Sequence, residues 1–191
     1  MNSALFLFYA FITFLIVQRL AELQISGRNT VSLLKAGGVE FGKKHYGVLV
    51  ALHTFFFISL ILEAFERQIK LSDEWPVFLA IFVVAQIGRV WVIRAMNGRW
   101  TTRIIVSPGV PLVNQGPFRF LPHPNYTIVA VELFTIPMLF NLYWTAMVFS
   151  LANAVVLITI RLPEENRALR WASGMHRNLE FSPRVHFSKG P

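Results

Sequence analysis

Long apolar stretches separated by short polar segments run through the chain. Five of them approach the roughly 20 apolar residues with which a helix crosses a bilayer core of about 30 Å. The fourth is short, contains Glu132 and Pro137, and is separated from the fifth only at about Asn141, so we expect these two to form a tight helical hairpin. The pattern predicts an all-α integral membrane protein with about five transmembrane helices, at residues 4–23, 47–65, 75–93, 126–140 and 142–160.

The composition supports a location in the lipid bilayer, because 54% of the 191 residues are hydrophobic and the mean hydropathy is +0.52. The net charge of +8 is not accompanied by a lysine-rich tail, a zinc-ligand pattern or an aromatic RNA-binding motif, so we expect no nucleic-acid partner. The absence of cysteine excludes disulfides and thiolate chemistry. The first apolar stretch lacks a basic segment and a small-residue cleavage site, which indicates a retained helix rather than a signal peptide.

The distribution of basic residues predicts how the chain crosses the membrane. All of the 18 lysines and arginines except Arg67 and Lys70 fall on the side of the first loop, the third loop and the C-terminal segment. Because cytoplasmic segments are enriched in these residues, we expect the N-terminus outside and the C-terminus in the cytoplasm. We treat residues 1–191 as one domain, with a three-helix part over 1–96 and the part that carries the chemistry over 97–191.

Two polar segments on the cytoplasmic side meet if the predicted hairpin forms. PHPNY, Pro122–Tyr126, ends the third loop, and RLPEEN, Arg161–Asn166, follows the last apolar stretch. Together they supply a histidine, a tyrosine, an arginine and two carboxylates. Each segment also has a purely structural interpretation as a helix start, with Asn125 as the N-cap or Pro163 at the first helical position. Their meeting favours a functional site, because ionisable groups at a lipid boundary cost free energy unless they are used or paired.

Other polar residues lie within or near the apolar stretches. Glu132 has Arg89 or Arg94 as its expected partner, and either binds substrate or forms an ion pair in the packing. His53 either lines a substrate cavity or makes a contact between helices. Trp100 stands in a loop, in GRWTTRIIV, where its ring could stack on a cationic or planar ligand.

The segment IIVSPGVPLV, residues 104–113, has β-branched runs around a Ser-Pro-Gly turn. This predicts a short extended cover at the membrane interface, which either closes a pocket or only connects helices. The chain has no glycine-rich phosphate loop, no GxSxG elbow and no metal-ligand spacing. We therefore expect no metal site and none of the enzyme classes that depend on these motifs.

The two polar segments resemble a known family. GPFRFLPHPNY, followed across the hairpin by RLPEENRAL, is similar to the paired signature of the isoprenylcysteine carboxyl methyltransferase family. The resemblance implies a membrane enzyme that uses S-adenosylmethionine, with a cytoplasmic cofactor pocket built from the loop before the fourth helix, the hairpin and the C-terminal helix. EFGKKHY, AQIGRVW and GRWTTRIIVSPG resemble a bacterial branch that O-methylates alkylpyrones and related phenolic lipids, which implies the bacterial cytoplasmic membrane.

The resemblance implies roles for residues of both segments. Arg161 would face the substrate, and His123 or Glu165 would act as a base where the substrate needs one. We also expect Trp100, Glu132 and His53 on the substrate side. The residues implied to bind S-adenosylmethionine are Gln115, Gly116, Pro117, Arg119, His123, Pro124, Tyr126, Glu164 and Glu165.

Two positions depart from the family pattern. Pro122 replaces an arginine that precedes the His-Pro pair, and Arg119 is expected to compensate for the lost cation. The C-terminal segment keeps only Gly174 of a Phe-Gly-x-x-Tyr pattern.

These features predict transfer of a methyl group to an oxygen of a lipophilic small molecule, an alkylpyrone or a related polyketide lipid. The sulfonium is already activated, so the protein mainly aligns the oxygen with the methyl group and excludes water. Ionised enols and carboxylates need no base, whereas a phenol with a pKa near ~10 does. Two alternatives stay open: methylation of an isoprenylcysteine carboxylate or a lipid amine, and a membrane protein without catalysis, for which Pro122 is the main support.

Overall fold

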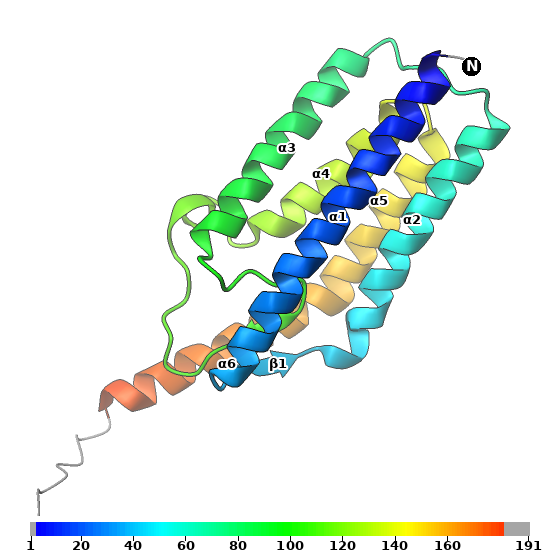
Figure 1. Ribbon diagram of the computed structural model, residues 1–191. Helices are drawn as coiled ribbons and strands as arrows, with labels where there is room; N and C mark the ends of the chain where they lie inside the picture. Colours follow the sequence, from blue (N-terminus) through cyan, green and yellow to red (C-terminus); the bar gives the residue numbers. More distant parts are fainter. Residues whose placement is uncertain (1–2, 182–191) are drawn as a thin grey trace, which may run out of the picture.

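The structure is a computed structural model that describes residues 3–181, a bundle of long helices with a two-stranded sheet at one end (Figure 1). Side chains from residue 174 onward lie outside the described part, and so does the predicted pattern at Gly174. The helices are α1 (Ser3–Lys35), α2 (Tyr46–Glu66), α3 (Trp75–Ala95), α4 (Pro124–Met138), α5 (Tyr143–Val156) and α6 (Leu162–Phe181). Shorter elements are the strands β1 (Val39–Phe41) and β2 (Ile104–Val106), the 3-10 turns η1 (Lys43–His45) and η2 (Gly116–Arg119), and the π-helical η3 (Leu157–Arg161).

Four helical segments within residues 3–181 are long and apolar enough to cross a membrane, which agrees with the predicted all-α membrane fold. The fourth predicted span differs, because α4 has only 15 residues. At 1.5 Å per residue it extends about 22 Å, less than the ~30 Å hydrocarbon core. It starts at Pro124 and is followed by a turn at Asn141, where φ is +56°. The crossing segments are Ser3–Lys35, Lys43–Glu66, Trp75–Ala95 and Tyr143–Ser173.

Helix α1 is longer than the stretch predicted from hydropathy. Its 33 residues extend about 50 Å, beyond the thickness of a bilayer core. Its buried face changes character along the helix, since Phe8, Ile12 and Leu15 are apolar whereas Glu22 and Ser26 are polar. Spacings of three and four residues keep these side chains on one face. The span predicted from hydropathy stopped at residue 23 because the second half of α1 contains polar residues, some of which are buried.

The chain passes from α5 into α6 without a break, through η3, where the sequence predicted a separate helix starting at Pro163. A proline inside a helix has no N–H for the carbonyl four residues back, and its ring collides with that carbonyl. In η3 the Leu162 N–H donates to the Leu157 carbonyl, five residues back. This wider turn accommodates Pro163 and places Arg161 in irregular helical geometry.

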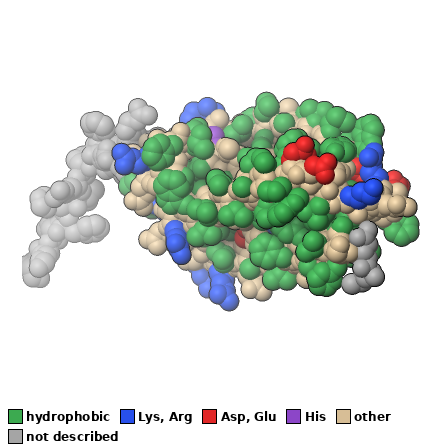
Figure 2. All heavy atoms as spheres, turned by 90° about the horizontal axis from the view of Figure 1, so that it is seen from above, with side chains coloured by type: hydrophobic (Ala, Val, Ile, Leu, Met, Phe, Trp, Pro, Cys, Tyr) green, Lys and Arg blue, Asp and Glu red, His purple; other side chains and the backbone are tan. Residues whose placement is uncertain are grey.

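The predicted hairpin of the fourth and fifth apolar stretches is confirmed. Helix α4 packs against both α3 and α5, and α5 also packs on α2. The main core joins α1, α2, α4 and the start of α5 through Phe8, Phe56, Leu60, Leu133 and Leu142. Many large apolar side chains remain exposed on the outside, and Figure 2 shows them spread over the view from above. In a membrane bundle this apolar surface faces lipid.

The sheet joins two loops that are far apart in the sequence. Strand β1 pairs antiparallel with β2, so the segment predicted as extended, residues 104–113, is a strand only in its first part and pairs with the first loop. Ala168 and Ala172 of α6 pack against the buried Ile104 and Val106 of β2. The first loop, the third loop and α6 therefore meet at one end of the bundle.

A buried carboxylate holds the start of α5 at the opposite end. Glu63, near the end of α2, is only 6% exposed. It accepts hydrogen bonds from the backbone N–H groups of Trp144 and Thr145, at 3.1 and 2.8 Å. These N–H groups are donors that a helix start leaves without a partner inside its own helix. Glu63 thereby ties α2 to α5.

Replacing Glu63 by alanine should lower the free energy of unfolding by about 1–3 kcal/mol, because two buried donors lose their acceptor. Titration with SDS in mixed micelles, followed by tryptophan fluorescence, measures this change. Glu66→Ala is the matched control in the same helix; its side chain is exposed, so the change should stay within about 0.5 kcal/mol. Equal effects of the two substitutions would contradict the capping role.

Candidate functional site

A cavity of about 400 Å³ opens where the third loop, β2 and the start of α6 meet. Its size falls within the ~300–1,000 Å³ typical of small-molecule pockets. Apolar residues of β2 and of the segment after it form much of the wall. Polar side chains of the wall include Arg99, Arg103, His123, Asn125, Tyr126, Arg161 and Glu165.

Three residues of the wall form one hydrogen-bonded chain. The Arg161 Nε–H donates to the Tyr126 hydroxyl at 2.8 Å, and this hydroxyl donates to the Glu165 carboxylate. His123 Nδ1 lies 3.4 Å from the other Glu165 oxygen. The His123 ring also stacks on Tyr126, with 5.6 Å between the ring centroids. The two sequence motifs therefore meet in the cavity wall, because the hairpin of α4 and α5 brings their ends together.

The Tyr126 hydroxyl stays protonated in this setting. Burial and the Glu165 carboxylate raise its pKa, and the Arg161 guanidinium opposes only part of the rise. Tyr126 lies at the cavity end of α4, the helix too short to cross the membrane. At neutral pH its oxygen thus accepts a hydrogen bond from the guanidinium, while its O–H donates a hydrogen bond to the carboxylate. One hydroxyl fixes both charged groups.

Three buried polar atoms on residues of the cavity wall have no hydrogen-bond partner among the side chains and backbone that the structure describes: Trp100 Nε1, His123 Nδ1 and Asn125 Oδ1. The 3.4 Å approach of His123 to Glu165 is within ion-pair reach but does not have hydrogen-bond geometry. Buried polar groups are normally paired, and an unpaired one costs about 1–3 kcal/mol. A ligand with both donors and acceptors would satisfy these atoms.

Six residues predicted from the sequence lie in the cavity wall. Trp100 is only 2% exposed, so its ring belongs to the packed wall and is not an open stacking face. Asn125, predicted only as an N-cap, lies inside α4, whose N-cap is His123, and also lines the cavity; its place inside PHPNY was the available signal. The six are Trp100, His123, Pro124, Tyr126, Arg161 and Glu165.

Five predicted cofactor residues lie outside this wall. Four of them belong to η2 or adjoin it, and η2 packs against α3. The Gln115 side chain donates to the Ala95 carbonyl at 3.4 Å, and a Cβ on Gly116 would lie 3.0 Å from that of Ala95. Glu164 instead faces Arg167 at 3.5 Å. The five are Gln115, Gly116, Pro117, Arg119 and Glu164.

Pro122, which replaces the arginine of the family pattern, lines the cavity. Arg119 was expected to compensate, but its side chain is exposed and lies outside the wall. Arg99 and Arg103 line the cavity in addition to Arg161. Arg103 donates to Glu40 of β1 at 2.7 Å, which fixes its position. The wall therefore retains cationic groups despite the proline.

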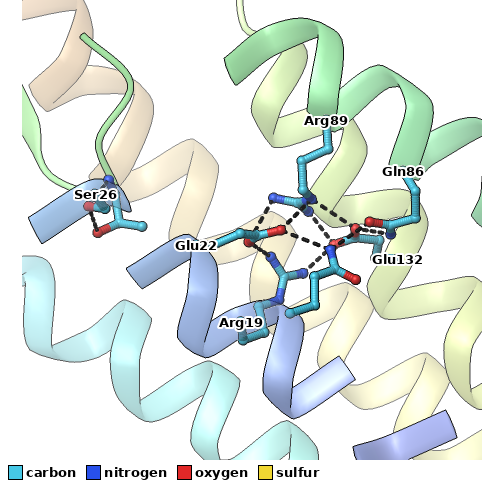
Figure 3. Close-up of polar contacts among 8 residues, drawn as sticks. Arg19, Glu22, Ser26, Gln86, Arg89 and Glu132 are labelled. Carbon is cyan, nitrogen blue, oxygen red and sulfur yellow. Dashed lines mark hydrogen bonds and ion pairs between the residues drawn. The ribbon is translucent and has the colours of Figure 1, made fainter. Parts of the chain in front are cut away.

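A second polar cluster lies inside the helix bundle (Figure 3). Glu22 of α1, Arg89 of α3 and Glu132 of α4 are 7%, 3% and 1% exposed. Arg89 pairs with both carboxylates, and so does Arg19 of α1. The Gln86 amide donates to Glu132 at 2.6 Å. Two guanidinium groups balance two carboxylates, as buried charges in a membrane require.

This cluster bears on three expectations. The predicted pairing of Glu132 with Arg89 is confirmed, whereas Arg94 is exposed. Glu132 makes its polar contacts inside the cluster, and His53 Nδ1 lies 2.9 Å from a carbonyl of its own helix. Neither side chain lines the cavity in which we expected them to contact substrate. Arg19 and Arg89 pair with buried carboxylates inside the bundle. They are therefore not loop charges and do not count toward the prediction of membrane orientation.

The fold and the site define an integral membrane protein with a polar pocket at one end of its helix bundle. A family model described as the isoprenylcysteine carboxyl methyltransferase (ICMT) family matches residues 78–171, which include both motif segments. The chain belongs to this family of membrane methyltransferases.

Two relatives match most of the chain. It is 38% identical to protein YpbQ of Bacillus subtilis (strain 168), described as uncharacterized, over 164 residues, which are 86% of this chain and 97% of that protein. It is 26% identical to an uncharacterized protein of Haemophilus influenzae (strain ATCC 51907 / DSM 11121 / KW20 / Rd) over 152 residues, 79% of this chain and 88% of the relative. No solved structure matches the chain.

Proposed function

We propose that this protein is an S-adenosylmethionine-dependent methyltransferase that methylates an oxygen of a lipophilic substrate, an alkylpyrone or a related polyketide lipid. The observation that carries this proposal is the meeting of two motif segments around one cavity, where Arg161, Tyr126 and Glu165 form a single hydrogen-bonded chain. Membership of the family supports methyl transfer as the reaction class.

The cavity faces the cytoplasm in this proposal. The first loop, the third loop and the start of α6 share its end of the bundle and carry many of the lysines and arginines. The opposite end carries Arg67 and Lys70 in the segment between α2 and α3. This asymmetry supports an N-terminus outside and a C-terminus in the cytoplasm.

The residues of the wall fit the cofactor. The Trp100 indole N–H donates, the Asn125 Oδ1 accepts, and the His123 Nδ1 does either, depending on its tautomer. A nucleoside joined to an amino acid carries both kinds of partner. The Glu165 carboxylate places negative charge beside a cationic ligand. When bound, S-adenosylmethionine supplies a methyl group that is already activated on a positively charged sulfur.

The side chains of the protein then orient the oxygen that receives the methyl group. Arg161 donates hydrogen bonds from Nε to the Tyr126 hydroxyl and from Nη2 to the Thr102 carbonyl. Its Nη1 has no partner within the described part of the chain. Nη1 is thus available for a charge-assisted hydrogen bond to an anionic oxygen. An ionised pyrone enol needs no base, whereas a phenolic lipid would need His123 to take its proton. The apolar wall accommodates an alkyl chain and excludes water.

The purified protein in detergent should bind S-adenosylmethionine with a Kd in the micromolar range, about −8 kcal/mol, measured by calorimetry. His123→Ala should weaken binding by about 10-fold or more, because it removes an unpaired polar atom and the ring that stacks on Tyr126. Gln115→Ala is the matched control, since this side chain is exposed and lies outside the wall. It should bind like the parent protein.

Methyl transfer separates the candidate substrates. With S-adenosylmethionine labelled in the methyl group, we expect label in a long-chain 4-hydroxy-6-alkyl-2-pyrone and none in N-acetyl-S-farnesylcysteine. The reverse result would assign carboxyl methylation instead, and label in an alkylamine would assign an amine substrate. No heat of binding in the parent protein, and none after Pro122→Arg, would contradict the proposal and favour a membrane protein without catalysis.

A further inference from the structure

Thr102, in the loop between α3 and β2, connects three separate parts of the molecule. We infer that Ser26, Tyr46 and Thr102 are positioning residues for Arg161, because they hold in place the backbone carbonyl that orients its guanidinium. This inference rests on the proposed function, in which Arg161 binds the substrate oxygen.

Helices α1 and α2 hold the loop through several bonds. The Thr102 N–H donates to Ser26 Oγ at 2.9 Å, and the two hydroxyl oxygens also lie 2.9 Å apart. The Tyr46 hydroxyl lies 3.1 Å from Thr102 Oγ1. One turn after Ser26, the Asn29 amide donates to the Trp100 carbonyl at 2.7 Å. Ser26 is 3% exposed and projects from α1 toward the loop (Figure 3), so its hydrogen bonds to Thr102 are shielded from water.

Thr102, held at its N–H and its hydroxyl, anchors Arg161 through its carbonyl. The Thr102 carbonyl accepts a hydrogen bond from Arg161 Nη2 at 3.0 Å, while the Tyr126 hydroxyl accepts one from Nε at 2.8 Å. A planar guanidinium held at two nitrogens has a fixed orientation. Arg161 stands in the π-helical η3, where the wider turn departs from regular helix geometry. The hydrogen bond to the Thr102 carbonyl, outside this helix, therefore contributes more to the position of the guanidinium than it would in a regular α-helix.

Thr102 is not itself part of the cavity wall, and its carbonyl contacts the wall residue Arg161. Arg161 lines the cavity, whereas Thr102, Ser26 and Tyr46 do not. Of the described residues of α1 and α2, only Leu33 is in the wall. Helices α1 and α2 thus affect the site by holding the loop that contains Thr102. Removing the hydroxyl group of Ser26 or Tyr46 should change turnover while leaving the affinity for S-adenosylmethionine unchanged.

A double-mutant cycle on the full-length protein in detergent tests this, with labelled S-adenosylmethionine and the long-chain 4-hydroxypyrone. Ser26→Ala should lower kcat about 10-fold, since a small displacement of a positioning group has effects of this order. The Kd for S-adenosylmethionine should stay within about two-fold. In an Arg161→Gln background, Ser26→Ala should lower kcat no further, because the group it positions is gone. Thr102→Ser, which keeps the hydroxyl, should retain the activity of the parent.

Thr54→Val is the control, because this exposed hydroxyl bonds only to its own helix; it should change kcat in neither background. An equally large loss from Ser26→Ala with and without Arg161 would overturn the inference, since it would indicate general destabilisation.

A second readout needs no substrate. In protein labelled with [15Nε]arginine, the Arg161 Nε–H is the resonance that Arg161→Gln removes. It should exchange with water about 10-fold faster in Ser26→Ala than in the parent, because local opening becomes easier. Unchanged exchange would overturn the inference. Faster exchange in a protein that does not bind S-adenosylmethionine would support the positioning role while the proposed function alone fails.

Discussion

Glu165→Gln is expected to lower kcat/KM for methyl transfer by about 100-fold or more, an effect typical of losing one preorganised electrostatic group. The substitution keeps the size of the side chain but removes the negative charge of the carboxylate, which accepts a hydrogen bond from the Tyr126 hydroxyl and has an oxygen 3.4 Å from His123 Nδ1. The affinity for S-adenosylmethionine should fall as well, because the carboxylate stands beside a cationic ligand. Label transfer to the 4-hydroxypyrone and calorimetry measure the two effects separately.

Glu164 offers a matched control one position earlier in α6. Its side chain pairs with Arg167 at 3.5 Å and lies outside the cavity wall. Glu164→Gln should therefore stay within about two-fold of the parent in both measurements. An equal loss in both variants would mean that net charge at the start of α6 controls the site. A loss confined to Glu164→Gln would assign the role of Glu165 to its neighbour.

The helices and the meeting of the two motifs were predictable because they depend on local patterns. Long apolar runs mark the membrane helices, and the short connection near Asn141 forces the fourth and fifth elements to run back to back. That topology alone brings Tyr126 beside Arg161 and Glu165. The pairing of Glu132 with Arg89 followed from a general rule, since a charge inside a membrane protein needs a partner.

Other features depend on packing that a local pattern does not contain. The continuous helix through Pro163 exists because a hydrogen bond in η3 spans five residues instead of four, which only the backbone geometry reveals. The 3-10 turn η2 was expected at the cofactor because its residues belong to the family signature, but η2 packs against α3, with Gly116 next to Ala95. Membership of a sequence motif does not by itself place a residue in the cavity wall.

The contacts of α1 were the hardest to predict. Arg19, Glu22 and Ser26 lie on one face of α1. Their contacts with α3, α4 and the third loop join residues that are 67 to 113 positions apart in the sequence. The predicted span, residues 4–23, ends near these residues, and no partner was predicted for them. The structure shows that α1 continues to Lys35 and that Glu22 and Ser26 are buried on it.

Removing the charge of Glu132 should have the largest effect on folding. Glu132→Gln leaves Arg19 and Arg89 with one carboxylate between them, in a cluster where Glu132 is 1% exposed. Breaking a buried ion pair leaves an uncompensated charge, so the free energy of unfolding should fall by about 3–5 kcal/mol. SDS titration in mixed micelles measures the change, and the yield of monodisperse protein should fall with it. The exposed Glu66→Gln is the control.

The double variant Glu132→Gln/Arg89→Gln decides whether charge is the cause. It leaves one guanidinium and one carboxylate, so the charges balance again, and at least about half of the lost stability should return. A double variant no more stable than Glu132→Gln would show that hydrogen-bond geometry, rather than charge balance, holds the cluster. The folded fraction of Glu132→Gln should methylate the pyrone like the parent, because Glu132 lies outside the cavity wall. A loss of turnover with unchanged stability would instead return Glu132 to a role in binding substrate.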